Sequence, residues 1–291
     1  QLDFRYVNVE DDMTLTAWVP NPSVIDFTNS NIRQIGTTFS VPWDKCAVAI
    51  NSDGTRIAHT VRAGNVGGVA APGFIRIYER DSTESSGWKQ LGEDTETKGG
   101  ANEYTGNNWV GFTRDGNYVA SIDPGSNNNH EGHMYVFGYN ANNDEWSSVG
   151  ADIGGGTGTN DGTYISYMAH SIINHSTLGL IAVVNYGSKR LKGFRYNGSS
   201  WVDLGSITSN TVAYYTSALA EYSTSGIMVA YYYNGTIYIK TNYGFNTTWT
   251  SHSTIPTTSI DSTFVTFNDT GTIIAIHEPT YDNSGSRYLA V

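Results

Sequence analysis

The sequence predicts an all-β protein, a single six-bladed β-propeller of four-stranded antiparallel blades with an incomplete last blade. Three observations predict it: the composition, a turn-and-strand element that recurs along the chain, and a recurring tryptophan pattern. Only 15% of the 291 residues are charged and 32 are glycine, a balance that disfavours a helical bundle. The 7 Trp, 20 Tyr and 10 Phe can fill a sizeable core, which disfavours disorder.

The recurring element is a tight turn followed by an apolar strand. Gly or Asp in each turn adopts backbone dihedrals that most residues avoid, so the chain can reverse its direction there. Strand-like runs precede and follow the copies, which gives three antiparallel strands per unit. The copies are residues 52–58, 114–120, 176–182, 224–230 and 269–275, with a degenerate copy at 12–17.

The fourth strand of a unit begins with a Trp-x-x-Leu-Gly pattern or a variant of it. Trp88, Trp146 and Trp201 open such strands, Ile32 takes the same place, and Trp249 opens a decayed copy. Four short strands repeated every ~40 to 60 residues are typical of a β-propeller, and a two-sheet sandwich is the alternative. The predicted blades of this single domain are residues 1–37, 38–95, 96–155, 156–206, 207–253 and 254–291.

One unit resembles the blades of a known class of propellers. Residues 50–58, followed by the strand at 74–78, are similar to a TolB-type or WD-repeat-like blade. The resemblance implies a propeller fold, but such blades serve unrelated functions. The Gly-His and Trp-Asp signatures of WD repeats are missing, as are Asp-rich calcium loops and the sialidase Asp-box. No catalytic residue is therefore carried over from a family.

Charge and composition restrict the partners. The net charge of −11 and the lack of a basic run argue against nucleic acid. No apolar stretch approaches the roughly 18 residues of a membrane span, so membrane insertion is not expected. The single cysteine, Cys46, excludes an internal disulfide framework and is expected to be a buried thiol. Few Lys and many Tyr, Asn, Thr and Ser indicate an extracellular protein or one at a cell or virion surface.

The ligand-binding candidates lie in a loop between the second and third strands of the third unit. Such loops are among the longest of the chain, and long loops on a rigid scaffold often carry binding; a solvated connection is the alternative. Two of the candidates, His130 and His133, are three residues apart in this loop, whereas the helical zinc motif needs histidines four residues apart. Neither a metal nor a cofactor is therefore predicted. The candidates are Asp123, His130, Glu131 and His133.

No catalytic residue is predicted, because the chain has no nucleophile elbow, phosphate loop or triad in a recognised order. Five Asn-x-Ser/Thr acceptors are candidate glycosylation sites. All but one are predicted on the face formed by the turns between strands 1–2 and 3–4. Occupancy is expected at Asn197 and Asn246 before Asn234, because the Asn-Gly hairpin at Asn234 is tight. The five acceptors are Asn174, Asn197, Asn234, Asn246 and Asn268.

The C-terminal unit has room for a third strand at Arg287–Val291 but not for a fourth. An unpaired edge accepts strands from other chains, so self-assembly through this edge is predicted. In the alternative, Gln1–Val9 pairs there and closes the ring. These patterns predict a non-enzymatic recognition or scaffold protein that binds protein or glycan, such as a subunit of a surface fibre, appendage or virion. A hydrolase or lyase acting on polysaccharide is the alternative function.

Overall fold

The computed structural model describes only part of the chain as strands and turns. The described residues are 4–9, 15–21, 47–61, 64–66, 69–71, 73–96, 109–123, 133–154, 171–186, 190–208, 217–256, 264–268 and 271–277. They form strands β1 to β24 and the turns between them. Within these ranges there is no helix, and so none that could cross a membrane. Cys46 lies outside the described residues.

Four of the large sheets are each built from antiparallel strands that follow the order of the chain, although in blade I the strands β5 and β6 stand between β4 and β7 in the sequence. Blade I contains β3 (Val48–Ile50), β4 (Arg56–Val61), β7 (Phe74–Arg80) and β8 (Trp88–Gln90), with β9 (Thr95–Glu96) also paired to β7. Blade II contains β10 (Val110–Phe112), β11 (Tyr118–Asp123), β12 (His133–Asn140) and β13 (Glu145–Ser148), with β14 (Ile153–Gly154) also paired to β12. Blade III contains β15 (Ser171–His175), β16 (Gly179–Tyr186), β17 (Arg190–Tyr196) and β18 (Trp201–Ser206). Blade IV contains β19 (Ser217–Ser223), β20 (Gly226–Tyr233), β21 (Thr236–Tyr243) and β22 (Thr250–Pro256). A separate hairpin pairs β5 (Gly64–Val66) with β6 (Val69–Ala71).

The fifth large sheet, which we call the closing blade, joins the two ends of the chain. Its strand order is β23 (Phe264–Phe267), β24 (Ile273–His277), β1 (Phe4–Val9) and β2 (Leu15–Asn21). Tyr6 lies opposite Ala275 in this sheet. The N-terminal strands therefore take the third and fourth places of the C-terminal sheet, rather than opening a first blade of their own as predicted.

This pairing corrects the prediction about the C-terminal edge. The edge of β24 is covered by β1 of the same chain, so self-assembly through the C-terminal edge is not supported. The N-terminal strand joins the C-terminal sheet by pairing with β24, whereas the alternative placed it beside Arg287–Val291. Arg287–Val291 lie outside the described residues. The described residues form five large sheets, so the predicted count of six blades is not confirmed.

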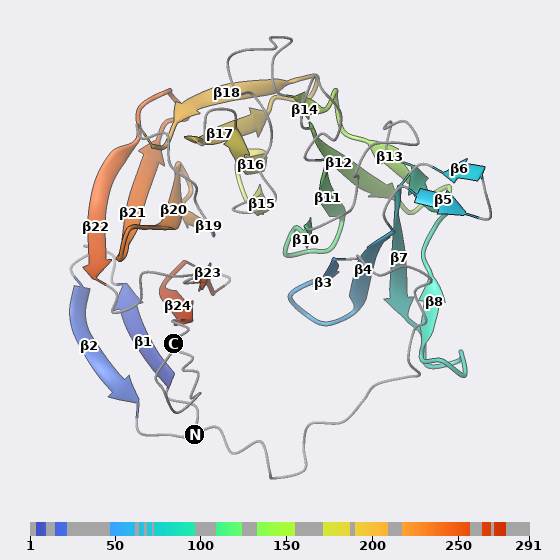
Figure 1. The fold of residues 1–291 in the computed structure, drawn as a ribbon, viewed down its shortest axis with the longest axis horizontal. Coiled ribbons are helices and arrows are strands. Elements are labelled where there is room, and N and C mark those ends of the chain that lie inside the picture. The colour runs from blue at the N-terminus through green and yellow to red at the C-terminus, as the bar shows by residue number, and fades with distance from the viewer. Residues whose placement is uncertain are drawn as a thin grey trace.

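The sheets are arranged around a common centre (Figure 1). The first strands of the sheets, β3, β10, β15, β19 and β23, lie nearest the centre, and later strands such as β13, β18, β22 and β2 lie at the periphery. Within each sheet neighbouring strands are antiparallel. This arrangement is that of an all-β propeller, as the sequence predicts.

Apolar side chains fill the interfaces between successive blades. Met134 of blade II and Leu180 of blade III belong to one buried cluster. In blade IV every residue of β20 except Tyr233 is buried. A strand inside a stack of sheets is covered on both faces, so its sequence is continuously apolar rather than alternating. The run at 226–233 therefore packs against two neighbouring blades at once.

In blades II, III and IV, the tryptophan at or just before the start of the fourth strand makes a hydrogen bond to the preceding blade. Trp146 Nε1 donates a hydrogen bond to the carbonyl of Leu91 at 2.9 Å. Trp201 Nε1 donates to the carbonyl of Val149 at 3.1 Å, and Trp249 Nε1 to that of Leu204 at 2.8 Å. Each acceptor is the third residue after the equivalent tryptophan of the preceding blade. We call this repeated contact the tryptophan latch, and it explains why Trp-x-x-Leu-Gly recurs at blade intervals.

A cysteine pair across the closing blade tests the pairing of the two chain ends. With Cys46 replaced by Ser, the double variant Tyr6→Cys/Ala275→Cys should form a disulfide under mild oxidation, because these two positions are register partners. The pair Tyr6→Cys/Ile273→Cys is the control, since Ile273 lies opposite Asn8 instead. Thiol titration and mass spectrometry measure the bond. If both pairs oxidise equally, or neither does, the register of β1 on β24 is wrong.

Candidate functional site

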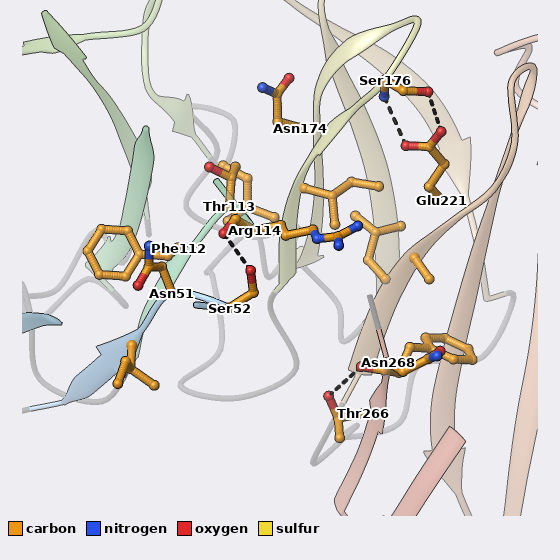
Figure 2. A pocket seen from close by; sticks show the side chains of 16 residues that line it. Asn51, Ser52, Phe112, Thr113, Arg114, Asn174, Ser176, Glu221, Thr266 and Asn268 are labelled. Carbon is orange, nitrogen blue, oxygen red and sulfur yellow. Dashed lines mark hydrogen bonds between the residues drawn. The ribbon is translucent and has the colours of Figure 1, made fainter. Parts of the chain in front are cut away.

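A cavity of about 480 Å³ lies at the centre of the ring, where the first strands end. We call it the central cavity. Figure 2 shows that its side chains come from separate strands that face one another. Every large sheet contributes to it, and the residues that line it are Ile50, Asn51, Ser52, Phe112, Thr113, Arg114, Ile172, Ile173, Asn174, Ser176, Leu219, Ala220, Glu221, Thr266, Phe267 and Asn268.

The polar lining follows from the turn chemistry of the repeat. In blade I, Asn51 Oδ1 accepts a hydrogen bond from the backbone N–H of Arg56 at 2.8 Å. In the closing blade, Asn268 Oδ1 accepts from the N–H of Ile273 at 2.8 Å. A short polar side chain at the end of the first strand thus closes the turn into the second strand. Because all first strands end near the centre, these turn residues gather into one polar rim.

Hydrogen bonds between blades hold this rim together. Ser52 Oγ of blade I donates to the carbonyl of Arg114 in blade II at 3.0 Å. Asn174 Nδ2 of blade III donates to Asp115 Oδ2 of blade II at 3.1 Å. Glu221 of blade IV accepts from the N–H of Ser176 at 2.9 Å and also from the Ser176 hydroxyl. The rim is therefore positioned by the rigid blades and by contacts between them.

Charge in the described lining is confined to two side chains. Glu221 is its only carboxylate and Arg114 its only cation. Partial burial raises the pKa of Glu221, but the hydrogen bonds from Ser176, with His175 and Arg114 nearby, outweigh burial and bring this pKa below its ordinary value. Glu221 is thus ionised at neutral pH, and it presents an acceptor rather than an acidic proton.

The lowered pKa of Glu221 makes a stability prediction. A carboxylate whose pKa is lower in the folded state stabilises the fold at pH above about 4.5, its ordinary pKa, and this contribution is lost as the pH falls through the folded-state pKa. Urea unfolding between pH 7 and pH 3 should therefore show a smaller loss of stability for Glu221→Gln than for the wild type. Glu84→Gln, at an exposed turn, is the control. Equal pH profiles for wild type and Glu221→Gln would contradict the role of the Ser176 contacts.

Apolar side chains form the remaining wall of the central cavity. Ile50, Phe112 and Phe267 are the last residues of β3, β10 and β23 and precede the polar turn residues in the chain. Ile50 is 59% exposed, an unusual value for a large apolar residue on a strand. The central cavity therefore combines an apolar wall with a polar rim, which suits a ligand that has both apolar and hydroxyl-bearing surfaces.

The residues predicted from the long loop are not part of this cavity. Asp123 lies opposite His133 at the other end of β11 and β12. His133 Nδ1 is 2.5 Å from Asp152 Oδ2, while His130 and Glu131 lie outside the described residues. Ligand binding by this loop stays a prediction. No group of three potential metal ligands occurs within the described part of the chain.

The glycosylation candidates are distributed as the repeat predicts. Asn197 and Asn246 lie in turns between third and fourth strands, and Asn234 lies in the turn between β20 and β21. Asn174 and Asn268 line the central cavity. All five are exposed, but Asn174 Nδ2, the atom that a glycan would modify, already donates to Asp115. Occupancy of these sites stays a prediction.

Sequence reasoning missed the residues that line the central cavity, above all Arg114 and Glu221. Each looks like an ordinary turn or strand residue in its own unit. The signal that could have found them is their position: Arg114 lies in the turn that follows β10, and Glu221 lies two residues before the end of β19. Superimposing the repeats would have shown that these positions converge on the axis of a propeller.

Comparison with known proteins establishes the fold. No protein-family model and no curated protein matches the sequence. The structure is similar to an α-L-arabinanase of Penicillium chrysogenum solved with arabinobiose, at 8% identity and a TM-score of 0.53 over 100% of this chain and 86% of the other. It is also similar to a periplasmic gluconolactonase of Pseudomonas aeruginosa, at 12% identity and a TM-score of 0.50 over 83% and 70%. A fucose-specific lectin from Aleuria aurantia is 17% identical, with a TM-score of 0.47 over 81% and 70%. The arabinanase and the gluconolactonase are β-propellers, and at such identities the likeness shows the fold alone.

The comparison corrects the prediction that the chain is not an enzyme. The arabinanase and the gluconolactonase are enzymes built on the same fold, so the propeller gives no reason to exclude catalysis. That prediction rested on the lack of a local catalytic motif. In this propeller the residues that line the central cavity come from every large sheet, so groups from distant segments can meet there without a motif within one segment.

Proposed function

We propose that the protein recognises a saccharide in the central cavity. The observation that carries this proposal is the combination of an apolar wall with a polar rim in one space of about 480 Å³, within the range of about 300 to 1,000 Å³ usual for small-ligand sites. A sugar ring presents apolar C–H faces and hydroxyl edges, and therefore needs both kinds of surface. The rim offers the exposed amide of Asn268 and the ionised carboxylate of Glu221.

Glu221 has a defined part in this proposal. An ionised carboxylate accepts hydrogen bonds strongly, and two of its acceptor positions are taken by Ser176. A carboxylate has about four such positions, so sugar hydroxyls can use the others. The Ser176 contacts also fix the orientation of the carboxylate before the ligand arrives, which reduces the entropy cost of binding.

We also propose that recognition takes place outside the cell or at a cell or virion surface. The low Lys content and the many Tyr, Asn, Ser and Thr residues support this location. The similar gluconolactonase is described as periplasmic, and the proposal is in keeping with it. Glycans at these surfaces are the class of partner that the cavity suits.

Two matched substitutions on β3 test the saccharide site. Ile50 and Val48 stand on the same side of β3 and are 59% and 67% exposed, but only Ile50 lines the cavity. A screen on immobilised glycans should identify bound sugars, and titration calorimetry should give their affinities. Ile50→Ser is expected to weaken binding about fivefold through lost apolar contact, whereas Val48→Ser should bind as the wild type does.

Two results would contradict the proposed saccharide site. If no sugar binds, or if Val48→Ser weakens binding as much as Ile50→Ser, the central cavity is not the saccharide site. Bound oligosaccharides should also be incubated with the protein and analysed for cleavage. Product formation that is lost in Glu221→Gln would favour the hydrolase or lyase alternative at this same site.

A further inference from the structure

We propose that the saccharide bound in the central cavity carries a carboxylate, as a uronic acid does, and that Arg114 binds this carboxylate. The inference rests on the proposed saccharide site and names the chemical class of its ligand. It depends on three features of the rim: the fixed position of Arg114, the existing contacts of Glu221, and the neutrality of the other polar side chains.

Arg114 is held at the rim by its backbone. Its carbonyl accepts hydrogen bonds from the N–H of Ser52 at 3.3 Å and from the Ser52 hydroxyl at 3.0 Å. The residue is exposed, and Figure 2 shows its side chain extending from the β10–β11 turn into the space between the first strands. The contact between blades I and II thus fixes the base of the side chain, while the guanidinium faces the cavity.

Glu221 carries the charge opposite to that of Arg114, and both residues line the central cavity. The carboxylate of Glu221 is oriented by two donors from Ser176, and Arg114 is near enough to contribute to its lowered pKa. Glu221 therefore acts as an acceptor for hydroxyls at one side of the cavity. The guanidinium at the other side is the only cationic group in the described lining.

The chemistry of the guanidinium selects the ligand. Its planar fork of N–H donors matches the two oxygens of a carboxylate, and this bidentate pairing is stronger and more directional than a bond to a hydroxyl. The neutral amide of Asn268, which is exposed, suits a ligand hydroxyl, and Phe112 offers an apolar surface. A pyranose acid places a carboxylate, hydroxyls and an apolar face on one ring, so it can use all three.

Calorimetric titration of matched sugars tests this assignment. The ligands are glucuronic and galacturonic acid with their neutral counterparts glucose and galactose, and N-acetylneuraminic acid as a carboxylate of different geometry. We expect the wild type to bind the acid of a matched pair at least about tenfold more tightly than the neutral sugar. Preference for a hexuronic acid over N-acetylneuraminic acid would identify the uronic acid as the source of the carboxylate.

Four variants separate the role of Arg114 from that of general charge. Arg114→Gln should abolish the preference for the acid, and Arg114→Lys should keep a part of it, because lysine retains the charge but not the fork. Arg190→Gln, which removes the same charge from the exposed start of β17, should leave it unchanged. Glu221→Gln should increase the preference for acids over neutral sugars, because it removes a charge that repels the ligand carboxylate, whereas the loss of the charged acceptor affects both classes.

The results distinguish this inference from the proposed function. If neutral sugars bind as tightly as their acids, or if the preference survives in Arg114→Gln, the inference is wrong while the saccharide site stands. If neither class binds, the saccharide site itself is wrong. Equal urea midpoints for the wild type and both Arg114 variants show that a lost preference does not come from unfolding.

Discussion

Replacing Trp146 by alanine is expected to lower the free energy of unfolding by about 3–5 kcal/mol. The side chain is 7% exposed, and its ring lies 5.1 Å from that of Tyr139. Its indole N–H donates to the carbonyl of Leu91 in the preceding blade. Truncation therefore leaves a cavity at a blade interface and removes the donor from a buried acceptor. Urea unfolding with linear extrapolation measures the change.

A second substitution separates packing from the hydrogen bond. Trp146→Phe keeps most of the ring contact but lacks the N–H, so it should cost about 1–3 kcal/mol. Trp201→Phe should give a similar loss, because Trp201 makes the same contact with Val149. Val202→Ala is the control: Val202 is 44% exposed, and its loss should stay within about 0.5 kcal/mol. A Trp146→Phe protein as stable as the wild type would contradict the latch.

The latch shows which parts of this fold can be predicted from the sequence. A tight turn, an alternating strand and a tryptophan spaced by blade length are local signals, and each specifies the conformation of its own segment. The predicted turn at residues 52–55 connects β3 to β4 as expected. The hydrogen bond from Trp146 to Leu91 explains why the tryptophan recurs, because this contact connects blade II to blade I.

The pairing of the chain ends could not be predicted in the same way. The alternation of apolar and polar residues in Phe4–Val9 predicts a strand. It does not show which strand will pair with this one, or whether it stands first or third in its sheet. Its pairing with Ile273–His277 joins segments more than 260 residues apart. Only the closure of the whole ring determines this contact.

The candidate site was missed for a related reason. Sequence reasoning placed binding in the longest loops, near His133, whereas the central cavity is lined by the ends of first strands and their short turns. Ser176 and Glu221 are 45 residues apart in the sequence and meet only because successive blades are neighbours. Their residue types are common in turns and strands, so neither stands out before the ring is formed.

Replacing Gly205 by alanine is expected to destabilise the protein by about 2–5 kcal/mol. Gly205 has a φ of +82°, in a region where an L side chain costs about 1–2 kcal/mol. A Cβ here would also lie 2.4 Å from the carbonyl oxygen of Thr247, and this overlap adds about 1–3 kcal/mol. The clashing atoms are backbone, so no side chain can rotate to relieve it.

Gly198→Ala separates the two costs. Gly198 has a φ of +98°, but a Cβ there would meet nothing within 4 Å, so this variant carries the backbone strain alone. Gly205 follows Leu204, whose carbonyl accepts the hydrogen bond from Trp249, and here the backbones of blades III and IV lie close together. Gly205→Ala should therefore unfold at a clearly lower urea concentration than Gly198→Ala. If the two variants lose equal stability, the close contact of Gly205 with Thr247 does not exist in solution. The glycine of the Trp-x-x-Leu-Gly pattern would then be required for its backbone conformation alone.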